Sequence, residues 1–334
     1  MYQFGILGCG MIAGIHAEAI AHMENARLVG VADNHQPTAA AFAEKHSVKA
    51  YATYADMLAD EEIDVVCICT PSAYHAPNAK QALLAGKHVV LEKPMALSTA
   101  EADELIAVCE QTGKKMTVIC QFRFSPDVQK VKELIKEGAF GKLSLCNILM
   151  KYHRKTEYFT NSPWHGRLAL EGGGALMNQG IHGIDLLEYV VGDIKRSTGR
   201  IATLSHDIEV EDTAVGVLEF ENGALGVVEA STCAYPGFSR RMEIHGDRGY
   251  VVFKENRIEK LMIDGTEIKG EAIHAVSTAN DPAALGYEMH RMQLSNLLAA
   301  IEGKEALLID GREGRKAIKV IEDIYRSAGR DAIG

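Results

Sequence analysis

A glycine-rich turn near the start of the chain, GILGCGMIAGIHAEAI, is the first candidate for chemistry. Within it, Gly8-x-Gly10-x-x-Ala13 follows a short apolar run and opens a helical pattern. Gly8 permits a tight turn, Gly10 lets the backbone approach a pyrophosphate, and the small Ala13 allows close packing of helix on strand. The N–H groups at the helix start, at Met11 and Ile12, attract phosphate charge. The motif predicts a binding site for the pyrophosphate of a dinucleotide, and the alternative is a strand-turn-helix connection without a ligand.

An acidic residue follows the second apolar run. Asp33, in GVADNH, lies about 20 residues beyond the glycines, where a carboxylate can accept hydrogen bonds from the adenosine ribose hydroxyls. A carboxylate there repels a 2′-phosphate, and no arginine follows it immediately. The pattern favours NAD over NADP as cofactor. The alternative is that Asp33 only starts a helix.

Two further groups of polar residues stand at the carboxyl ends of predicted strands, where open α/β sheets bind ligands. One is Thr70-Pro71, with His75 shortly after it, and the other is Glu92-Lys93-Pro94. We expect both groups to border the cofactor. Lysine at the end of a buried strand is unusual, because burial of an ammonium group is costly unless the group is paired or its pKa falls. The alternative is an ion pair between Lys93 and Glu92.

A polar stripe follows the run Gly172-Gly173-Gly174. If Ala175–Val191 is a helix, four polar residues spaced at i, i+4, i+7 and i+11 share one face, and these are Asn178, His182, Asp185 and Tyr189. A solvated helix face normally carries Lys or Arg, and this segment has neither. The stripe therefore predicts a polar cleft, with a structural histidine as the alternative.

Two patterns of secondary structure must position these residues. Up to about residue 121, near-continuous apolar strands alternate with helical segments, which predicts an α/β domain with a doubly wound parallel Rossmann sheet. After residue 122, short strands follow one another, and Asn222-Gly223 and Asp264-Gly265 are turn signals. We expect a cofactor domain at 1–122 and an α+β domain with a large, mostly antiparallel sheet at 123–334, with a loop at about 270–281.

Further residues are candidates for substrate contact. Arg123 lies at the predicted domain junction, and Tyr152 lies in LMKYHRKTEYF with the cations Lys151, His153, Arg154 and Lys155. The cations favour an anionic sugar or a nucleotide sugar, and the alternative is ordinary surface charge. Trp164 is the single tryptophan, and it can stack on a sugar ring, pack internally or form an oligomer contact.

Composition excludes several classes of partner. The chain has 334 residues, of which 35 are Lys or Arg and 45 are Asp or Glu, so its net charge of −10 argues against a nucleic-acid surface. The sequence contains no run of about 18 apolar residues, so it predicts no membrane-spanning helix. The seven cysteines have neither zinc-site nor disulfide-framework spacing, so we expect reduced thiols, a cytoplasmic location and no metal site.

The combination of motifs resembles the Gfo/Idh/MocA oxidoreductase family over essentially the whole chain. The matching motifs are GxGxxA at the first turn, Thr70-Pro71 with His75, Glu92-Lys93-Pro94, and GGG followed by G-x-H-x-x-D up to Asp185. The resemblance implies a Rossmann domain, an open-faced sheet domain, and homodimers or homotetramers. It also implies NAD(P)-linked oxidation of sugars or cyclitols, Lys93 beside the nicotinamide and the substrate, a cis Lys93–Pro94 bond, and His182 as proton acceptor. Inositol dehydrogenase-like members carry Asp one turn before the histidine, whereas this chain has Asn178.

These observations lead to one functional prediction with two alternatives. We expect NAD-dependent oxidation of a secondary hydroxyl of a sugar, sugar acid, nucleotide sugar or cyclitol. His182 is expected to accept the proton, Lys93 to stabilise the alkoxide, and Asn178 to orient the substrate. The reverse assignment, with Lys93 as base, stays open. The alternatives are a glycosidase-like enzyme with tightly held NAD, and a non-catalytic NAD or ligand sensor.

Overall fold

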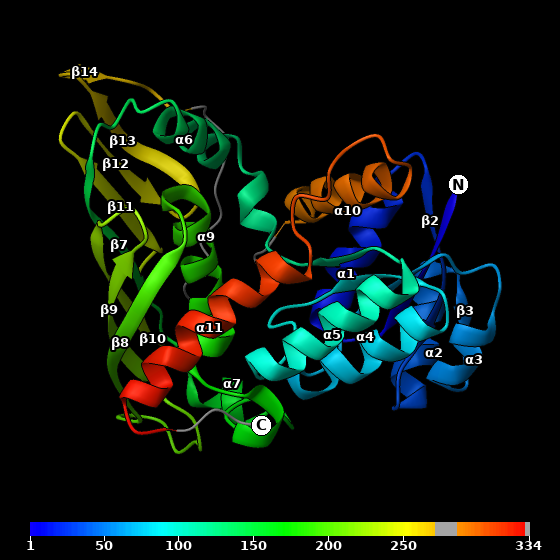
Figure 1. The fold of residues 1–334 in the computed structure, drawn as a ribbon. Coiled ribbons are helices and arrows are strands. Elements are labelled where there is room, and N and C mark those ends of the chain that lie inside the picture. Colours follow the sequence, from blue (N-terminus) through cyan, green and yellow to red (C-terminus); the bar gives the residue numbers. More distant parts are fainter. Residues whose placement is uncertain (271–285, 331–334) are drawn as a thin grey trace. The chain divides into compact units, whose positions relative to one another are not determined.

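The computed structural model describes residues 1–270 and 286–330, which group into two compact units (Figure 1). The unit here named unit 1 comprises Met1–Gln121 and Gly286–Arg315, and unit 2 comprises Phe122–Leu285 and Lys316–Gly334. The domain boundary at residue 122 stays a prediction. The grouping differs from it in residues 286–315, which join unit 1 because their helix packs on that unit's core.

Unit 1 is built on a six-stranded parallel sheet in the order β3-β2-β1-β4-β5-β6. The strands are β1 (Tyr2–Leu7), β2 (Ala26–Ala32), β3 (Lys49–Ala50), β4 (Val65–Ile68), β5 (His88–Leu91) and β6 (Met116–Val118). The helices are α1 (Met11–Ala21), α2 (Gln36–His46), α3 (Tyr54–Ala59), α4 (His75–Leu84), α5 (Thr99–Thr112) and α10 (Glu288–Ile301), with the 3₁₀ turn η1 (Ser72–Tyr74). The order of the strands reverses between β1 and β4, so ligands are expected at the carboxyl ends of these strands. The predicted doubly wound Rossmann sheet is confirmed.

The core of unit 1 joins the two ends of its sequence. Ala13, Ala17 and Ile20 of α1 are buried in one apolar cluster with Leu294 and Leu298 of α10. Small residues on α1 allow a helix from much later in the chain to pack closely against it. Residues 286–315 are therefore an integral part of the unit that carries the glycine-rich turn.

Unit 2 is built on an eight-stranded sheet in the order β14-β13-β12-β11-β7-β10-β9-β8. Its strands are β7 (Leu143–Lys151), β8 (Ile194–Ala202), β9 (Thr213–Phe220), β10 (Leu225–Ser231), β11 (Arg241–Gly246), β12 (Gly249–Lys254), β13 (Arg257–Ile263) and β14 (Thr266–Glu267). Among the described strands, β7 and β10 pair in parallel and the other neighbours pair antiparallel. The predicted, mostly antiparallel sheet is confirmed, and Asn222-Gly223 and Asp264-Gly265 connect neighbouring strands as expected.

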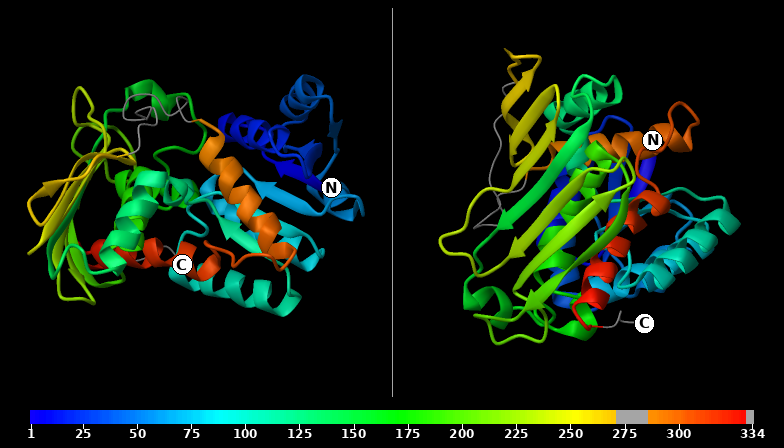
Figure 2. Two further views of the ribbon diagram at one scale, coloured as in Figure 1. Left: turned by 90° about the horizontal axis from the view of Figure 1, so that it is seen from above. Right: turned by 60° about the vertical axis from the view of Figure 1, so that its left-hand side comes forward.

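The helices of unit 2 are α6 (Pro126–Lys136), α7 (Thr156–Thr160), α8 (Leu168–Glu171) and α9 (Ile181–Val191), and α11 (Gly311–Ser327) continues from unit 1 into unit 2. Of these, α6 packs on β13, and α9 packs on β7 and β11, so that they cover one face of the sheet (Figure 2). Along β9, burial alternates residue by residue, so Val215 and Val217 are exposed on the opposite face while Ala214 and Leu218 are buried. This alternation is the pattern of a sheet with one covered face.

The predicted helix at Ala175–Val191 has two parts. Residues Ala175–Gly180 form a π-helical turn, and α9 begins at Ile181. A π turn widens the helix and is often found at functional sites. The loop predicted at about 270–281 lies outside the described residues, apart from Gly270. No helix among residues 1–270 and 286–330 is both long and apolar enough to cross a membrane.

Candidate functional site

The turn between β1 and α1 presents a helix N-terminus without a side-chain cap. Gly10 is the N-cap residue, no side chain hydrogen-bonds at the cap, and the first turn of α1 holds no acidic residue. A Cβ atom added to Gly10 would meet nothing within 4 Å, whereas one added to Gly8 would lie 2.7 Å from the carbonyl oxygen of Cys69. Gly8 also has a φ of +88°, which favours glycine. The turn is therefore pinned against the end of β4 and leaves its N–H groups open to an anion.

Asp33 follows β2 and is hydrogen-bonded to this turn. Its Oδ2 accepts from the backbone N–H of Cys9 at 2.8 Å, and its Oδ1 accepts from the N–H of His35 at 2.8 Å. Each carboxylate oxygen has a further lone pair that can accept a hydroxyl hydrogen. The residues present therefore fit a dinucleotide, with N–H donors for its phosphates and a carboxylate for its ribose.

Thr70, Pro71 and His75 lie at the end of β4, but the side chain of His75 faces the interior. Its Nδ1 lies 2.6 Å from the carbonyl oxygen of Pro94, and its Nε2 lies 2.7 Å from that of Thr70. Burial lowers the pKa of His75, although the two carbonyl groups act in the opposite direction. His75 therefore ties the ends of β4 and β5 together, and a direct cofactor contact through its ring is not favoured.

Glu92 also turns inward. It is 5% exposed, and its Oε1 lies 2.7 Å from Nε2 of His16 on α1 and 4.0 Å from Nε2 of His290 on α10. Burial opposes ionisation of Glu92, but the hydrogen bond and charge of His16, with His290 and Lys93, outweigh it and lower the pKa of Glu92 to about 2. Burial likewise opposes the charging of His16, yet Cys69, Cys67 and the hydrogen bond to Glu92 raise its pKa well above the usual value. Glu92 thus anchors α1 below the strand end that carries Lys93.

His16, Glu92 and His290 bring three potential metal-ligand atoms within 4.8 Å of one another. Two atoms bound to one tetrahedral metal at 2.0–2.2 Å would lie about 3.4 Å apart, farther than the 2.7 Å between His16 and Glu92. The three side chains therefore form a buried, hydrogen-bonded ion pair, His16 with Glu92, and a neighbouring histidine, His290. Lys93 follows directly, and its peptide bond to Pro94 is cis, as the family resemblance implied.

In unit 2, Asn178 lies in the π-helical turn and His182 in the first turn of α9. The ring of His182 packs edge-on against Phe122, with 5.4 Å between the ring centroids. Both polar side chains are half-buried, whereas their neighbours Met177 and Ile181 are buried. Asn178 and His182 therefore lie where the buried interior of unit 2 meets its surface.

The other half of the predicted stripe is internal. Arg123 is 1% exposed, and its guanidinium donates to both oxygens of Asp185 at 2.7 and 3.1 Å. Arg123 also lies 4.6 Å from the ring centre of Tyr189. Asp185 therefore neutralises the charge of Arg123 within the fold. Because the guanidinium is already paired and buried, the substrate contact that the sequence suggested for Arg123 is not favoured.

Asn178 is the centre of a hydrogen-bonded group that the sequence did not reveal. Its Nδ2 donates to Oε1 of Glu171 and lies 3.4 Å from the Tyr158 hydroxyl. Oε1 of Glu171 also lies 3.1 Å from Nδ1 of His165, and its Oε2 accepts from the N–H of Gly166 at 2.6 Å. Glu171 directly precedes the glycine run, and His165 directly follows the single tryptophan, but neither position stands in a periodic pattern that marks it.

The remaining predicted substrate residues lie in unit 2 as well. Tyr152 is buried, which raises its pKa to about 12, and the guanidinium of the buried Arg154 lies 5.5 Å from its ring centre. Trp164 is half-buried, with its ring 3.8 Å from the ring of His165. Tyr152 is thus a core residue, whereas Trp164 adjoins the Asn178 group.

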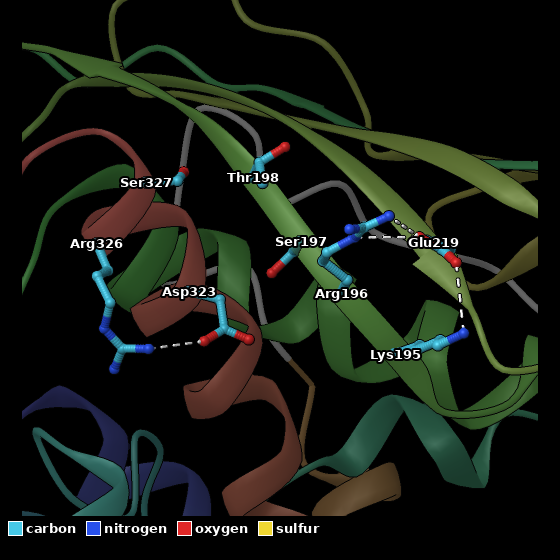
Figure 3. Close-up of a pocket in the computed structure, with 8 residues that line it drawn as sticks. All are labelled: Lys195, Arg196, Ser197, Thr198, Glu219, Asp323, Arg326 and Ser327. Atoms are coloured by element: carbon cyan, nitrogen blue, oxygen red, sulfur yellow. Dashed lines mark hydrogen bonds and ion pairs between the residues drawn. The ribbon is translucent and has the colours of Figure 1, made fainter.

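A surface hollow in unit 2 contains none of the predicted residues (Figure 3). Its lining comes from β8, β9 and α11 and comprises Lys195, Arg196, Ser197, Thr198, Glu219, Asp323, Arg326 and Ser327. The charged side chains pair with one another, as Arg196 does with Glu219 at 2.6 Å and Arg326 with Asp323 at 3.3 Å. This hollow is therefore not the candidate site.

Comparison with known proteins identifies relatives over nearly the whole chain. Residues 2–120 match the model of an oxidoreductase family with an NAD-binding Rossmann fold, and residues 128–252 match the GFO/IDH/MocA C-terminal domain. The uncharacterized oxidoreductase YrbE of Bacillus subtilis is 30% identical over 260 residues, which cover 76% of this chain and 74% of that protein. The myo-inositol 2-dehydrogenase of Thermotoga maritima is 28% identical over 270 residues, covering 78% and 77%. The WlbA dehydrogenase of Bordetella pertussis, solved in complex with NADH and UDP-GlcNAcA, is 31% identical with a TM-score of 0.87, covering 98% of this chain and 96% of that one.

Proposed function

Because the chain belongs to the Gfo/Idh/MocA family of NAD-binding oxidoreductases, we propose that it is a dehydrogenase that uses NAD rather than NADP. The substrate is a sugar, sugar acid, nucleotide sugar or cyclitol, and a secondary hydroxyl of it is oxidised. The relatives support this range, because one is named for myo-inositol and another was solved with UDP-GlcNAcA.

The observation that carries the proposal is the set of groups at the carboxyl edge of the parallel sheet in unit 1. The uncapped start of α1, the carboxylate of Asp33 and the side chain of Lys93 all follow strands of this edge. An anion-binding helix terminus beside an acidic ribose acceptor is the arrangement that dinucleotides require. Asp33 supports the preference for NAD, because a carboxylate at that position repels a 2′-phosphate.

When bound, NAD supplies an acceptor for the hydride that leaves the substrate carbon. The hydroxyl proton needs a separate acceptor, and His182 suits this role because imidazole titrates near neutral pH. Lys93 supplies positive charge for the alkoxide that develops. Asn178 holds a substrate hydroxyl in place, since an amide can form hydrogen bonds but cannot accept the proton. The reverse assignment, with Lys93 as the base, remains the alternative for the proton step.

The test is NADH absorbance while purified protein and NAD are exposed to inositols, aldoses, uronic acids and nucleotide sugars. We expect NADH formation with at least one member of this panel. If no compound of the panel produces NADH, although calorimetry shows that the protein binds NAD, the proposal is contradicted. In that case, NAD that co-purifies and is reduced only transiently would indicate the glycosidase-like alternative, and NAD that is bound without any redox change would indicate the sensor.

A further inference from the structure

His165 has no role in the proposed function, yet several contacts fix the position of its ring. Its ring stacks on Tyr158, with 4.3 Å between centroids and 21° between planes, and it lies 3.8 Å from the ring of Trp164. The backbone N–H of His165 donates to the hydroxyl of Ser162 at 3.2 Å. These contacts leave the ring little rotational freedom.

The orientation of the ring is set by Glu171. A carboxylate only accepts hydrogen bonds, so the 3.1 Å contact assigns the proton of His165 to Nδ1. Glu171 is itself buried and is held by the N–H of Gly166 and by Nδ2 of Asn178. A histidine whose Nδ1–H is fixed by a buried carboxylate has its Nε2 available for other chemistry.

The Nε2 atom of His165 is the one polar atom of this ring without an assigned contact. Within residues 1–270 and 286–330 it has no hydrogen-bond partner, and the side chain is 16% exposed. Nδ1 of the same ring lies 3.5 Å from Nδ2 of Asn178, which places His165 directly beside a predicted substrate residue. An imidazole nitrogen held next to the substrate region can form a hydrogen bond with a sugar hydroxyl.

We propose that His165, oriented by Glu171, is a substrate-binding residue whose Nε2 hydrogen-bonds a hydroxyl of the sugar or cyclitol. Glu171 acts as a positioning residue for both His165 and Asn178. The pair also places a carboxylate next to position 178, where inositol dehydrogenase-like members of the family carry their own Asp. This inference rests on the proposed function for the chemical class of its ligand.

Trp164 gives a test that does not depend on turnover. It is the single tryptophan and contacts His165, so its fluorescence should respond when a ligand binds there. The probes are myo-inositol, D-glucose, D-glucuronate and UDP-glucose, each titrated in the presence of saturating NADH. The variant His165→Phe keeps a ring for stacking on Tyr158 and removes both nitrogens, and His165→Gln restores a polar side chain. His245→Phe is the matched control, because His245 stacks on Tyr250 in the sheet.

We expect His165→Phe to raise the dissociation constant of the best probe at least tenfold, His165→Gln to recover part of the loss, and His245→Phe to bind like wild type. Thermal unfolding checks that the variants are folded. Wild-type affinity in His165→Phe, or wild-type fluorescence that responds to none of the probes, would overturn the inference. A fluorescence response that His165→Phe abolishes, without NADH formation by the wild type from NAD, would support the inference and contradict the proposed function.

Discussion

Replacing Glu92 with glutamine tests the buried ion pair of unit 1. The side chain keeps its size but loses the charge that faces His16 at 2.7 Å. Folding lowers the pKa of Glu92 from 4.5 to about 2, and a shift of this size corresponds to about 3 kcal/mol of stability. Removing one partner of a buried pair costs a similar amount, about 3–5 kcal/mol, because the other charge is left uncompensated. We therefore expect Glu92→Gln to lower the free energy of unfolding by about 3 kcal/mol at pH 7.

The dependence of this loss on pH has a definite sign. The pKa of Glu92 is lower in the folded state, so its stabilisation is present above about pH 4.5 and is lost as the pH falls toward 2. Urea unfolding followed by circular dichroism, at several pH values, should show the two proteins converging at acid pH. Asp103→Asn is the control, because it removes an ion pair with Arg315 at the surface of the same unit and should change little. Two results would refute the reasoning: a decrease in the free energy of unfolding below about 1 kcal/mol at pH 7, or a difference between wild type and Glu92→Gln that grows at acid pH.

Four further substitutions, one of them with a matched control, test the site and the turn that precedes α1. Lys93→Ala and His182→Ala should each lower turnover by about 100-fold or more while the calorimetric affinity for NAD stays nearly unchanged, and near-normal rates in both would contradict their roles. Asp33→Ala should narrow the preference for NAD over NADP in steady-state kinetics, and an unchanged ratio would show that its carboxylate does not bind the ribose. Gly8→Ala should cost about 2 kcal/mol or more in thermal or urea unfolding, because it forces a side chain into a positive-φ position against neighbouring backbone. Gly14→Ala, inside α1 and with nothing within 4 Å, should be neutral or stabilising, and equal losses in the two variants would argue against the steric explanation.

Local sequence patterns were sufficient to predict much of the fold. The apolar run DVVCIC indicated a buried strand, and β4 occupies Val65–Ile68 with every residue buried. Turn chemistry likewise located Asn222-Gly223 between β9 and β10, because few residues other than glycine and asparagine tolerate such turns. These features depend on neighbours within a few positions, which is the range over which a sequence pattern carries information.

Contacts between distant residues were not predictable in the same way. Periodicity placed Asp185 on a polar helix face but did not indicate that Arg123 neutralises it, nor that Glu92 faces His16 across 76 positions. The helical pattern at Ala175–Val191 also contained no sign of the π turn. Residue type and spacing identify which side chains are polar and which of them lie on the same helix face. The partner of each side chain depends on the tertiary fold.

The place of α10 in unit 1 has a consequence for how the protein is made. A ribosome must synthesise all of residues 122–285 before it reaches the helix that covers α1. Until then, the nascent cofactor-binding unit exposes the apolar surface of α1 that Leu294 and Leu298 later bury. Domains commonly fold in order as they emerge, but here the first unit cannot be completed before the second has been translated. Premature termination anywhere before residue 286 would therefore impair the NAD-binding half of the protein as well as the part that is missing.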